Sequence, residues 1–360
     1  MRTLGEAFAA DFAMNVTSVL WAFNFAGVLT PEFASEVRDI LQKVGRELDK
    51  ARPGLLRSAK CDEGRLAGPE VPHIELDLDD MFVIYKPPGW EVDTADVGDG
   101  RWLSRYLQGL LPWPHRPLVF DVSHSYGFLH RLDTLSSGLI LTAKTYEAYY
   151  HLKFQLSIGT LVRDYVVLCH GMVPPSRREI NERVYHRNVE GNLASTICQK
   201  GKPSKTYLKV LAHLGRNDQE FSLVAIRICT GRRHQIRAHT THIGHPTVCD
   251  GKYTAPAVFL ADREWCERNF VHRYRLAFTD LSSRSHEAMT PLPADLVQAL
   301  SCLTPRGTHS EAVLAEWLNG RALRDWAEYE VLASTQDASQ KKKLNSVSHF
   351  FLTNFRPESH

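Results

Sequence analysis

A series of short apolar segments with strand-like composition is the feature that most constrains the fold of this chain. Each segment holds β-branched, aromatic or leucine side chains and is bounded by turn-forming residues, which is the pattern of a β-strand. A helical stretch at about 145–157 separates two of them. Short strands with interspersed helices predict an α+β fold with a mainly antiparallel sheet. The predicted strands cover residues 81–86, 138–143, 161–169, 205–211, 221–229 and 270–278.

The first 50 residues predict a pair of helices that precedes this domain. The first helix runs to Gly27. The second begins after Thr30, whose hydroxyl suits an N-cap, with Pro31 at the first helical position. Because a single helical hairpin cannot bury its apolar faces alone, we expect it to pack on the next domain. The second helix carries the i, i+3, i+4 stripe of a one-sided helix at Val37, Ile40, Leu41, Val44 and Leu48.

Composition divides the rest of the chain into three parts. Residues 51–72 contain prolines and glycines among charges, which predicts a linker. We expect residues 73–302 to form the main domain, because the predicted strands fall within them. Residues 303–360 are then a helical extension that becomes polar and contains three consecutive lysines at 341–343.

Cysteine usage and hydropathy indicate the compartment. The seven cysteines have no metal-ligand spacing, and their odd number favours free thiols in a reducing environment. The longest apolar stretch, 16–29, is shorter than the roughly 20 residues that span a bilayer, so we expect no membrane segment. Glu6 and Asp11 disfavour a targeting peptide. We therefore expect a cytoplasmic protein, with mitochondrion or plastid as the alternatives.

Charge is distributed unevenly, although the formal net charge is only +2. Residues 151–280 contain 20 lysines and arginines and 11 aspartates and glutamates, so they carry +9 and the remainder carries −7. A basic central segment fits a phosphate-binding groove and equally an ordinary solvated surface. Charge alone leaves both interpretations open.

Two polar residues stand out within the predicted strands and turns. Asp133 lies in "GFLHRLDTLSSGLILTAKT" (127–145), in a turn that leads into a strand. An aspartate in such a turn is usually a backbone cap, and less often a catalytic group. Tyr165 lies in the middle of the strand "LVRDYVVLCHG" (161–171), where a core tyrosine is the simplest interpretation.

A third cluster, "TGRRHQIRAHTTHIGHPTVCDGKY" (230–253), predicts a short helix after a strand. Arg233 and Arg237 are four residues apart, so we expect them to share one helix face. An arginine on a packed helix can hold a carboxylate in a fork of two hydrogen bonds. His239, His242 and His245 do not predict a zinc site, since three ligands at that spacing cannot all share one helix face.

These three clusters together resemble the hallmark segments of the RluA-type pseudouridine synthases. Upstream, "LDLDDMFVIYKPPGWEV" resembles the family's opening segment with its Lys-Pro-x-Gly turn. Downstream, "FVHRYRLAF" and "PLPADLVQAL" resemble its closing strand and last helix. The resemblance is continuous over about residues 73–302. It implies a central, mainly antiparallel sheet with flanking helices and a cleft across its middle, and no cofactor or metal.

The resemblance also implies site residues. Asp133 matches the catalytic aspartate, and Arg237 matches the arginine that pairs with the aspartate. Tyr165 matches the active-site tyrosine that packs on the target base and is a candidate base at the sugar. Arg131 matches the arginine that fills the space left by a flipped nucleotide. Cys249 departs from the family, which usually has glycine there. The expected substrate-binding residues are His130, Arg131, Arg232, Arg233, His234 and Gln235.

The function implied is isomerisation of uridine to pseudouridine in structured RNA, ribosomal or transfer, by base flipping and exchange of the C–N for a C–C glycosidic bond. We expect RNA as the partner and a monomer. The alternative is a catalytically inactive RNA-binding protein of the same fold. A glycoside hydrolase is disfavoured, because that chemistry generally needs a second positioned carboxylate. Residues 13–50 also resemble, loosely, one octotricopeptide-type helical repeat.

Overall fold

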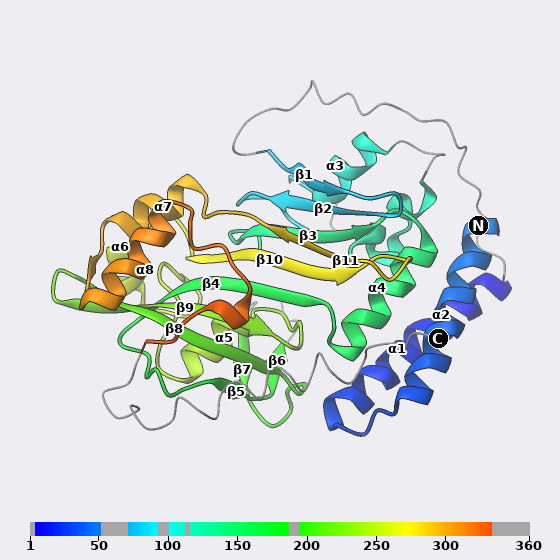
Figure 1. Ribbon diagram of the computed structural model, residues 1–360, viewed down its shortest axis with the longest axis horizontal. Coiled ribbons are helices and arrows are strands. Elements are labelled where there is room, and N and C mark those ends of the chain that lie inside the picture. Colours follow the sequence, from blue (N-terminus) through cyan, green and yellow to red (C-terminus); the bar gives the residue numbers. More distant parts are fainter. Residues whose placement is uncertain (1–3, 52–70, 93–100, 112–115, 187–193, 333–360) are drawn as a thin grey trace. The chain divides into compact units, whose positions relative to one another are not determined.

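The structure is a computed structural model that describes residues 4–51, 71–92, 101–111, 116–186 and 194–332. The chain divides into two compact units. The first comprises residues 1–165 and 268–293, and the second comprises residues 166–267 and 294–360. Figure 1 labels most of the helices and strands of both. The single domain predicted over 73–302 stays a prediction.

The first unit contains strands in the order β1-β2-β3-β10, with β11 paired to β10. Neighbouring strands are antiparallel except β3 and β10, which are parallel. β2 and β3 are buried along their whole length, so this part of the sheet is covered on both faces. The strands are β1 (His73–Asp77), β2 (Met81–Lys86), β3 (Ser137–Ala143), β10 (Val271–Thr279) and β11 (Ser285–Met289).

Gly138 permits the parallel contact between β3 and β10. It lies opposite Arg273 in the register and has a φ of 120°. A Cβ at Gly138 would lie 2.2 Å from the backbone oxygen of Arg273. Only glycine adopts this backbone conformation without strain and leaves room for the facing strand. The glycine therefore sets how close β10 comes to the start of β3.

The N-terminal helices α1 (Leu4–Ala26) and α2 (Pro31–Ala51) pack on α4 (Tyr146–Ile158) in the first unit (Figure 1). The predicted cap is present, since the Phe33 backbone N–H donates to the Thr30 hydroxyl at 3.3 Å. α2 buries the predicted stripe, except that Ile40 is exposed and Val44 is half-buried. The expectation that the hairpin packs on the following domain is confirmed by its contacts with α4.

Asp49, near the end of α2, caps the start of α4. Its carboxylate accepts the backbone N–H groups of Tyr146 and Glu147, both at 2.9 Å. These are two of the N–H groups that the first turn of a helix leaves without an intrahelical partner. The remaining helices of this unit are α3 (Leu103–Leu110), η1 (Pro117–Phe120) and η2 (Val122–Gly127).

The second unit contains the order β9-β8-β12, with β5 also paired to β8, and all these pairs are antiparallel. β8 and β9 form a hairpin through Asn217 and Asp218, which both have positive φ. Two-residue hairpins favour this conformation, because its twist matches that of the strands. β6 pairs with β7 separately. The strands are β5 (Glu179–Asn181), β6 (Val184–His186), β7 (Ser195–Ile197), β8 (Lys205–Arg216), β9 (Gln219–Ile228) and β12 (Thr304–Pro305).

The helices of the second unit include the one that carries Arg237. They are α5 (Gln235–His242), α6 (Pro256–Arg263), α7 (Ala294–Ser301), α8 (Thr308–Leu318) and η3 (Trp326–Glu328). Strand β4 (Val162–His170) belongs to the first unit up to Tyr165 and to the second from Val166. Within the described ranges, no helix is long and apolar enough to cross a membrane.

The predicted mainly antiparallel α+β fold is confirmed. Each predicted strand is present, with boundaries that differ by one or two residues except at the end of β8, which extends five residues beyond the predicted strand. The short strands β1, β5, β6, β7, β11 and β12 were not predicted, because two to five residues carry too little periodicity. Most of the predicted linker and the three lysines at 341–343 lie outside the described residues.

Candidate active site

The loop that carries Asp133 precedes β3 and is held by two neighbouring segments. The Asp133 backbone oxygen accepts the Ser136 N–H at 3.0 Å, so the loop closes a turn, and the Asp133 side chain is half-buried. The Thr134 backbone oxygen accepts the Gly89 N–H at 2.8 Å and the Lys86 ammonium at 3.1 Å. Arg268 supports the other side, donating to the Leu135 oxygen and the Ser137 hydroxyl, both at 2.9 Å.

Lys86, at the end of β2, is a buried residue to which the sequence assigned no role. Its side chain is 0% exposed, and its ammonium also donates to the backbone oxygens of Pro87 at 3.0 Å and Trp90 at 2.9 Å. Burial, and then the charge of Arg268, lower the pKa of Lys86 to about 7, while Asp133 acts in the opposite direction. Lys86 therefore joins the Lys-Pro-Pro-Gly turn to the Asp133 loop, close enough to Asp133 to feel its charge.

Tyr165 is paired with a buried arginine from β10. Tyr165 is 3% exposed and Arg273 is 1% exposed. The Arg273 guanidinium donates through Nη2 to the Tyr165 hydroxyl, and it lies 4.8 Å from the centroid of the ring. The phenol is thus held both at its oxygen and at its face.

Arg273 also contacts the segment that leads to Asp133. Nη1 lies 2.7 Å from His130 Nδ1 and donates to the Leu139 oxygen at 2.9 Å, while Nη2 donates to the Arg131 oxygen at 3.2 Å. Burial, and next the charge of Arg273, hold the pKa of His130 well below its usual value. His130 is therefore neutral, and Nδ1 accepts, because a guanidinium can only donate. Arg131 itself is exposed.

Arg237 lies on α5 in the second unit, held by an aspartate. Nε and Nη2 donate to the two carboxylate oxygens of Asp250, at 2.7 and 2.6 Å. Asp250 is 1% exposed and also accepts the Thr247 hydroxyl and the Lys252 N–H, both at 3.1 Å. The Arg237 guanidinium is 5.0 Å from the Tyr253 ring centroid. Asp250 stands in the segment 230–253, but nothing in its spacing identifies it as the partner of Arg237.

The residues that precede Arg237 correct one prediction. α5 begins only at Gln235, because His234 adopts a left-handed conformation with φ 53°. Arg233 therefore precedes the helix, and the expectation that it shares a helix face with Arg237 is wrong. His234 contacts the Tyr253 hydroxyl through Nδ1 at 3.2 Å.

Gln235 and Arg232 make contacts within the protein. The Gln235 side-chain oxygen accepts the Thr230 hydroxyl at 2.7 Å and the Arg232 N–H at 3.1 Å, and its nitrogen donates to Lys205 and Thr206 on β8. The Arg232 guanidinium donates to the Pro203 oxygen, and burial lowers its pKa. Both side chains thus fix the strand-to-helix turn. Their predicted role in substrate binding, like that of His130, Arg131, Arg233 and His234, stays a prediction.

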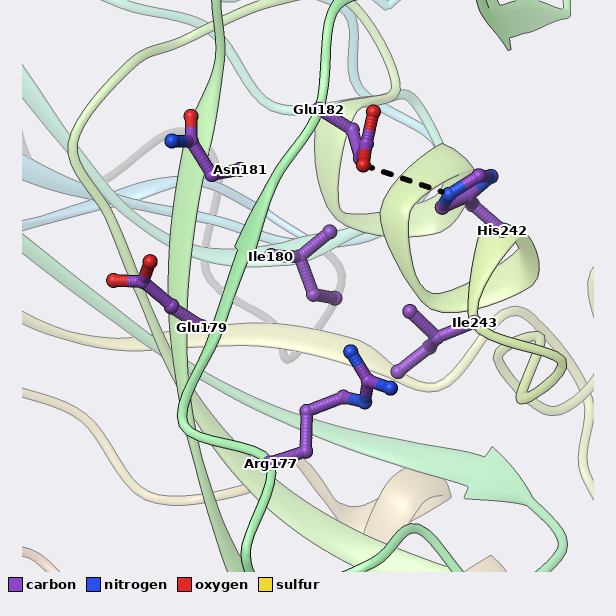
Figure 2. Close-up of a pocket in the computed structure, with 7 residues that line it drawn as sticks. All are labelled: Arg177, Glu179, Ile180, Asn181, Glu182, His242 and Ile243. Atoms are coloured by element: carbon purple, nitrogen blue, oxygen red, sulfur yellow. Dashed lines mark ion pairs between the residues drawn. The ribbon is translucent and has the colours of Figure 1, made fainter.

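The three histidines at spacing three have separate partners. His239 is buried between the Thr206 hydroxyl and the Glu182 oxygen, and burial lowers its pKa to about 4. His245 contacts the His170 oxygen at 2.9 Å. His242 lies 3.9 Å from the Glu182 carboxylate at a surface pocket of about 370 Å³ (Figure 2). None of the predicted site residues lines this pocket, whose lining is Arg177, Glu179, Ile180, Asn181, Glu182, His242 and Ile243.

In the first unit, Arg273 contacts His130, Tyr165 and the backbone of Arg131, and Asp133 follows Arg131 by two residues. The second unit contains the residues from Arg232 to Arg237. An ion pair between Asp133 and Arg237 would join the two units and stays a prediction.

Comparison with known proteins identifies the class. The solved structure named Human RNA Pseudouridylate Synthase Domain Containing 1 is similar over 70% of this chain and 96% of that chain, with a TM-score of 0.50 and 23% sequence identity. That likeness shows the fold. The sequence profile of the family described as RNA pseudouridylate synthase matches residues 80–242.

Curated relatives define the family further. Ribosomal large subunit pseudouridine synthase D of Neisseria meningitidis serogroup A is 35% identical over 236 residues, which is 62% of this chain and 59% of the relative. An uncharacterized RNA pseudouridine synthase of Mycobacterium bovis is 32% identical over 64% of this chain and 72% of the relative. The chain belongs to the RNA pseudouridine synthases of the RluA type. It spans about 59% of the length of the first of these relatives.

Proposed function

We propose that this chain isomerises uridine to pseudouridine in structured RNA, with Asp133 as the catalytic carboxylate. The observation that carries the proposal is the Asp133 loop, fixed by Lys86 and Arg268 in the same unit as Tyr165. Family membership supplies the reaction. Because a curated relative is named for the large ribosomal subunit, we propose ribosomal RNA as the first substrate class and transfer RNA as the second.

The chemistry explains why these residue types are needed. The uracil–ribose C–N bond must break, the detached base must turn, and C5 must then join the sugar. C5 loses its proton in this exchange, and N1 gains one. Folded RNA hides the target, so the nucleotide is extruded into a pocket. An ionised carboxylate at Asp133 acts as a nucleophile or assists the cleavage. Tyr165 holds the base while it turns, and stacking of a base on an aromatic ring contributes about 1–3 kcal/mol.

Arg237 has a defined part in this proposal. The fork to Asp250 uses its Nε and Nη2, and we propose Arg237 as the arginine that pairs with the catalytic aspartate, as the family resemblance implies. A cation beside Asp133 keeps the carboxylate charged. Asp250 then orients Arg237 for this contact, because a bidentate fork fixes the plane of the guanidinium.

The test is tritium release from RNA labelled at C5 of uridine. Asp133→Asn keeps the size of the side chain and removes its charge, so release stops while folding and RNA binding are retained. Asp79→Asn, an exposed aspartate of the same unit, is the matched control and keeps full activity. Release at the wild-type rate by a folded Asp133→Asn protein would reject Asp133 as the catalytic residue.

The same assay separates the alternative, an inactive RNA-binding protein of this fold. Such a protein binds RNA and releases no tritium from any uridine. Under either function, the +9 charge of residues 151–280 predicts that RNA affinity falls steeply with salt, since phosphate contacts release counterions. A flat salt response would mean that this charge lies away from the RNA.

The proposal extends to organisation and location. Residues 73–302 act as the catalytic domain, with the hairpin 1–50 and the extension 303–360 as additions to it. The protein works as a monomer in the cytoplasm, with mitochondrion or plastid as alternatives. Sedimentation and localisation of the tagged full chain test these two statements.

A further inference from the structure

We propose that Arg273 is a positioning residue for this reaction, which fixes the Tyr165 hydroxyl and the segment before Asp133 with one guanidinium. The inference rests on the proposed function and extends it to a residue outside the segments that suggested Asp133, Tyr165 and Arg237. Three features of Arg273 carry it.

The first feature is a buried cation without a carboxylate. Arg273 is 1% exposed, and in the described part of the chain its hydrogen-bond partners are neutral groups. They are His130 Nδ1, the Tyr165 hydroxyl and the backbone oxygens of Arg131 and Leu139. Its Nε is buried and has no hydrogen-bond partner there. Burying a charge on such terms is costly. If the side chain only filled space, an apolar residue of similar size would give a more stable fold.

The second feature is the direction of the hydrogen bond to Tyr165. A guanidinium donates and cannot accept, so the Tyr165 oxygen is the acceptor. The tyrosine's own proton must then point away from Arg273. The contact therefore selects one orientation of the hydroxyl, whereas a free phenol would rotate among several. A group that takes part in proton transfer gains from such orientation, because geometry comes before acidity in general acid–base catalysis.

The third feature is the span of the contacts. The same guanidinium contacts Tyr165 on β4. It also contacts His130 and Arg131, which precede Asp133 by three and two residues. The backbone of Arg273 is fixed against Gly138 in the parallel pair of β3 and β10. One side chain on a fixed strand thus sets the distance between the candidate tyrosine and the aspartate loop, which is the geometric control that a catalytic constellation requires.

A double-mutant cycle tests the proposal with the full-length chain. Arg273→Gln lowers kcat about 100-fold, the size typical for loss of one oriented donor, and leaves KM within about 3-fold. In the Tyr165→Phe background, Arg273→Gln lowers kcat by less than about 3-fold, because the hydroxyl it orients is already missing. Arg273→Lys keeps the positive charge and serves as the second variant if Arg273→Gln does not fold. It lowers kcat by less than Arg273→Gln, and again has little further effect in the Tyr165→Phe background.

Arg275 supplies the matched control. It lies on the same strand and is also buried, but it pairs with Asp164 and Glu287. Arg275→Gln lowers the melting temperature, leaves kcat of the folded enzyme unchanged, and has the same small effect in the Tyr165→Phe background. This control separates damage to β10 from loss of the contact to Tyr165.

The outcomes are distinguishable. An active wild-type enzyme in which the Arg273 and Tyr165 losses multiply overturns the role of Arg273 and leaves the proposed function standing. Losses in KM alone, or unfolding of both Arg273 variants, also overturn it, since they indicate a structural or binding role. A wild-type chain that releases no tritium from any RNA overturns the proposed function, and with it this inference.

Discussion

Two arginines of this protein, the half-buried Arg237 and the buried Arg273, are held in opposite ways. Arg237 faces Asp250 in a fork of two short hydrogen bonds, so a carboxylate compensates its charge locally. Arg273 faces neutral acceptors, and its charge adds to the effect of burial in lowering the pKa of His130 and of Lys86. The comparison teaches that a compensated arginine holds its own segment in place, whereas an uncompensated one makes the surrounding interior positive.

That positive interior surrounds the Asp133 loop. Lys86, Arg268 and Arg273 all belong to the first unit, and both arginines lower the pKa of Lys86 while Asp133 raises it. A carboxylate near buried cations is favoured in its charged form. The interior of the first unit thus places two buried cations, Lys86 and Arg268, against the backbone of the Asp133 loop.

The largest expected effect comes from removing the carboxylate that pairs with Arg237, and with it the fork that distinguishes Arg237 from Arg273. Asp250→Ala leaves a mostly buried guanidinium without its carboxylate, and loss of one partner of a buried pair costs about 3–5 kcal/mol. We expect the free energy of unfolding in urea to fall by this amount. The exposed Asp79→Ala serves as the control and changes it by less than about 0.5 kcal/mol. A loss below 1 kcal/mol for Asp250→Ala would mean that the two arginines are held alike.

The next effect tests the backbone that holds Arg273. Gly138→Ala places a Cβ against the backbone of the facing strand at a positive φ. Neither strand can yield easily, so we expect a loss near the upper end of the overpacking range, about 3 kcal/mol. Gly109→Ala, on α3 with no atom within 4 Å of its added Cβ, is the matched control and is neutral or stabilising. Equal stability of the two variants would mean that Gly138 is not needed for the close contact between β3 and β10.

The third effect is a pH dependence of stability, which compares the buried His239 with the exposed His242. His239 has a folded pKa of about 4 because of burial, below the ordinary 6.5. The unfolded chain therefore binds more protons between these values, and stability falls as the pH is lowered from 7 through this window. At pH 4.5 the contribution of His239 is a loss of about 2–3 kcal/mol.

The measurement is urea unfolding at pH 7 and pH 4.5. His239→Gln removes the titration, so this variant loses about 2–3 kcal/mol less than the wild type over that interval. His242→Gln alters an exposed histidine of the same helix and keeps the wild-type pH dependence. Identical slopes for wild type and His239→Gln would show that His239 is not titrating at low pH.

The smallest effect is expected where α2 meets α4. Asp49→Ala removes the cap from the Tyr146 and Glu147 N–H groups, and loss of such a cap costs about 1 kcal/mol. Hydrogen exchange at these two amides should accelerate. Asp39→Ala, exposed on the same helix, leaves exchange unchanged. Unaltered exchange in Asp49→Ala would mean that the hairpin is held by apolar packing alone.

Much of the fold could be predicted from the sequence, because its signals are local. Strand β2, helix α4 and the start of α2 at Thr30 each follow from periodicity and capping within a single segment. The candidate site was predictable only in part. An aspartate in a turn has no local mark of catalysis, so Asp133 was identified through the order of the motifs around it.

The sequence by itself thus determined the longer strands, helix α4, the N-terminal hairpin and the family segments that contain Asp133, Tyr165 and Arg237. The tertiary structure decided which residues meet: Asp250 with Arg237, Arg273 with Tyr165, and Lys86 with the Asp133 loop. It also decided that α5 begins after Arg233, since His234 is held in a left-handed conformation against Tyr253. The physical reason is the distance along the chain over which each effect acts. Propensity and periodicity act over one element, whereas the partner of a buried charge is selected by the folding of segments far apart in the chain.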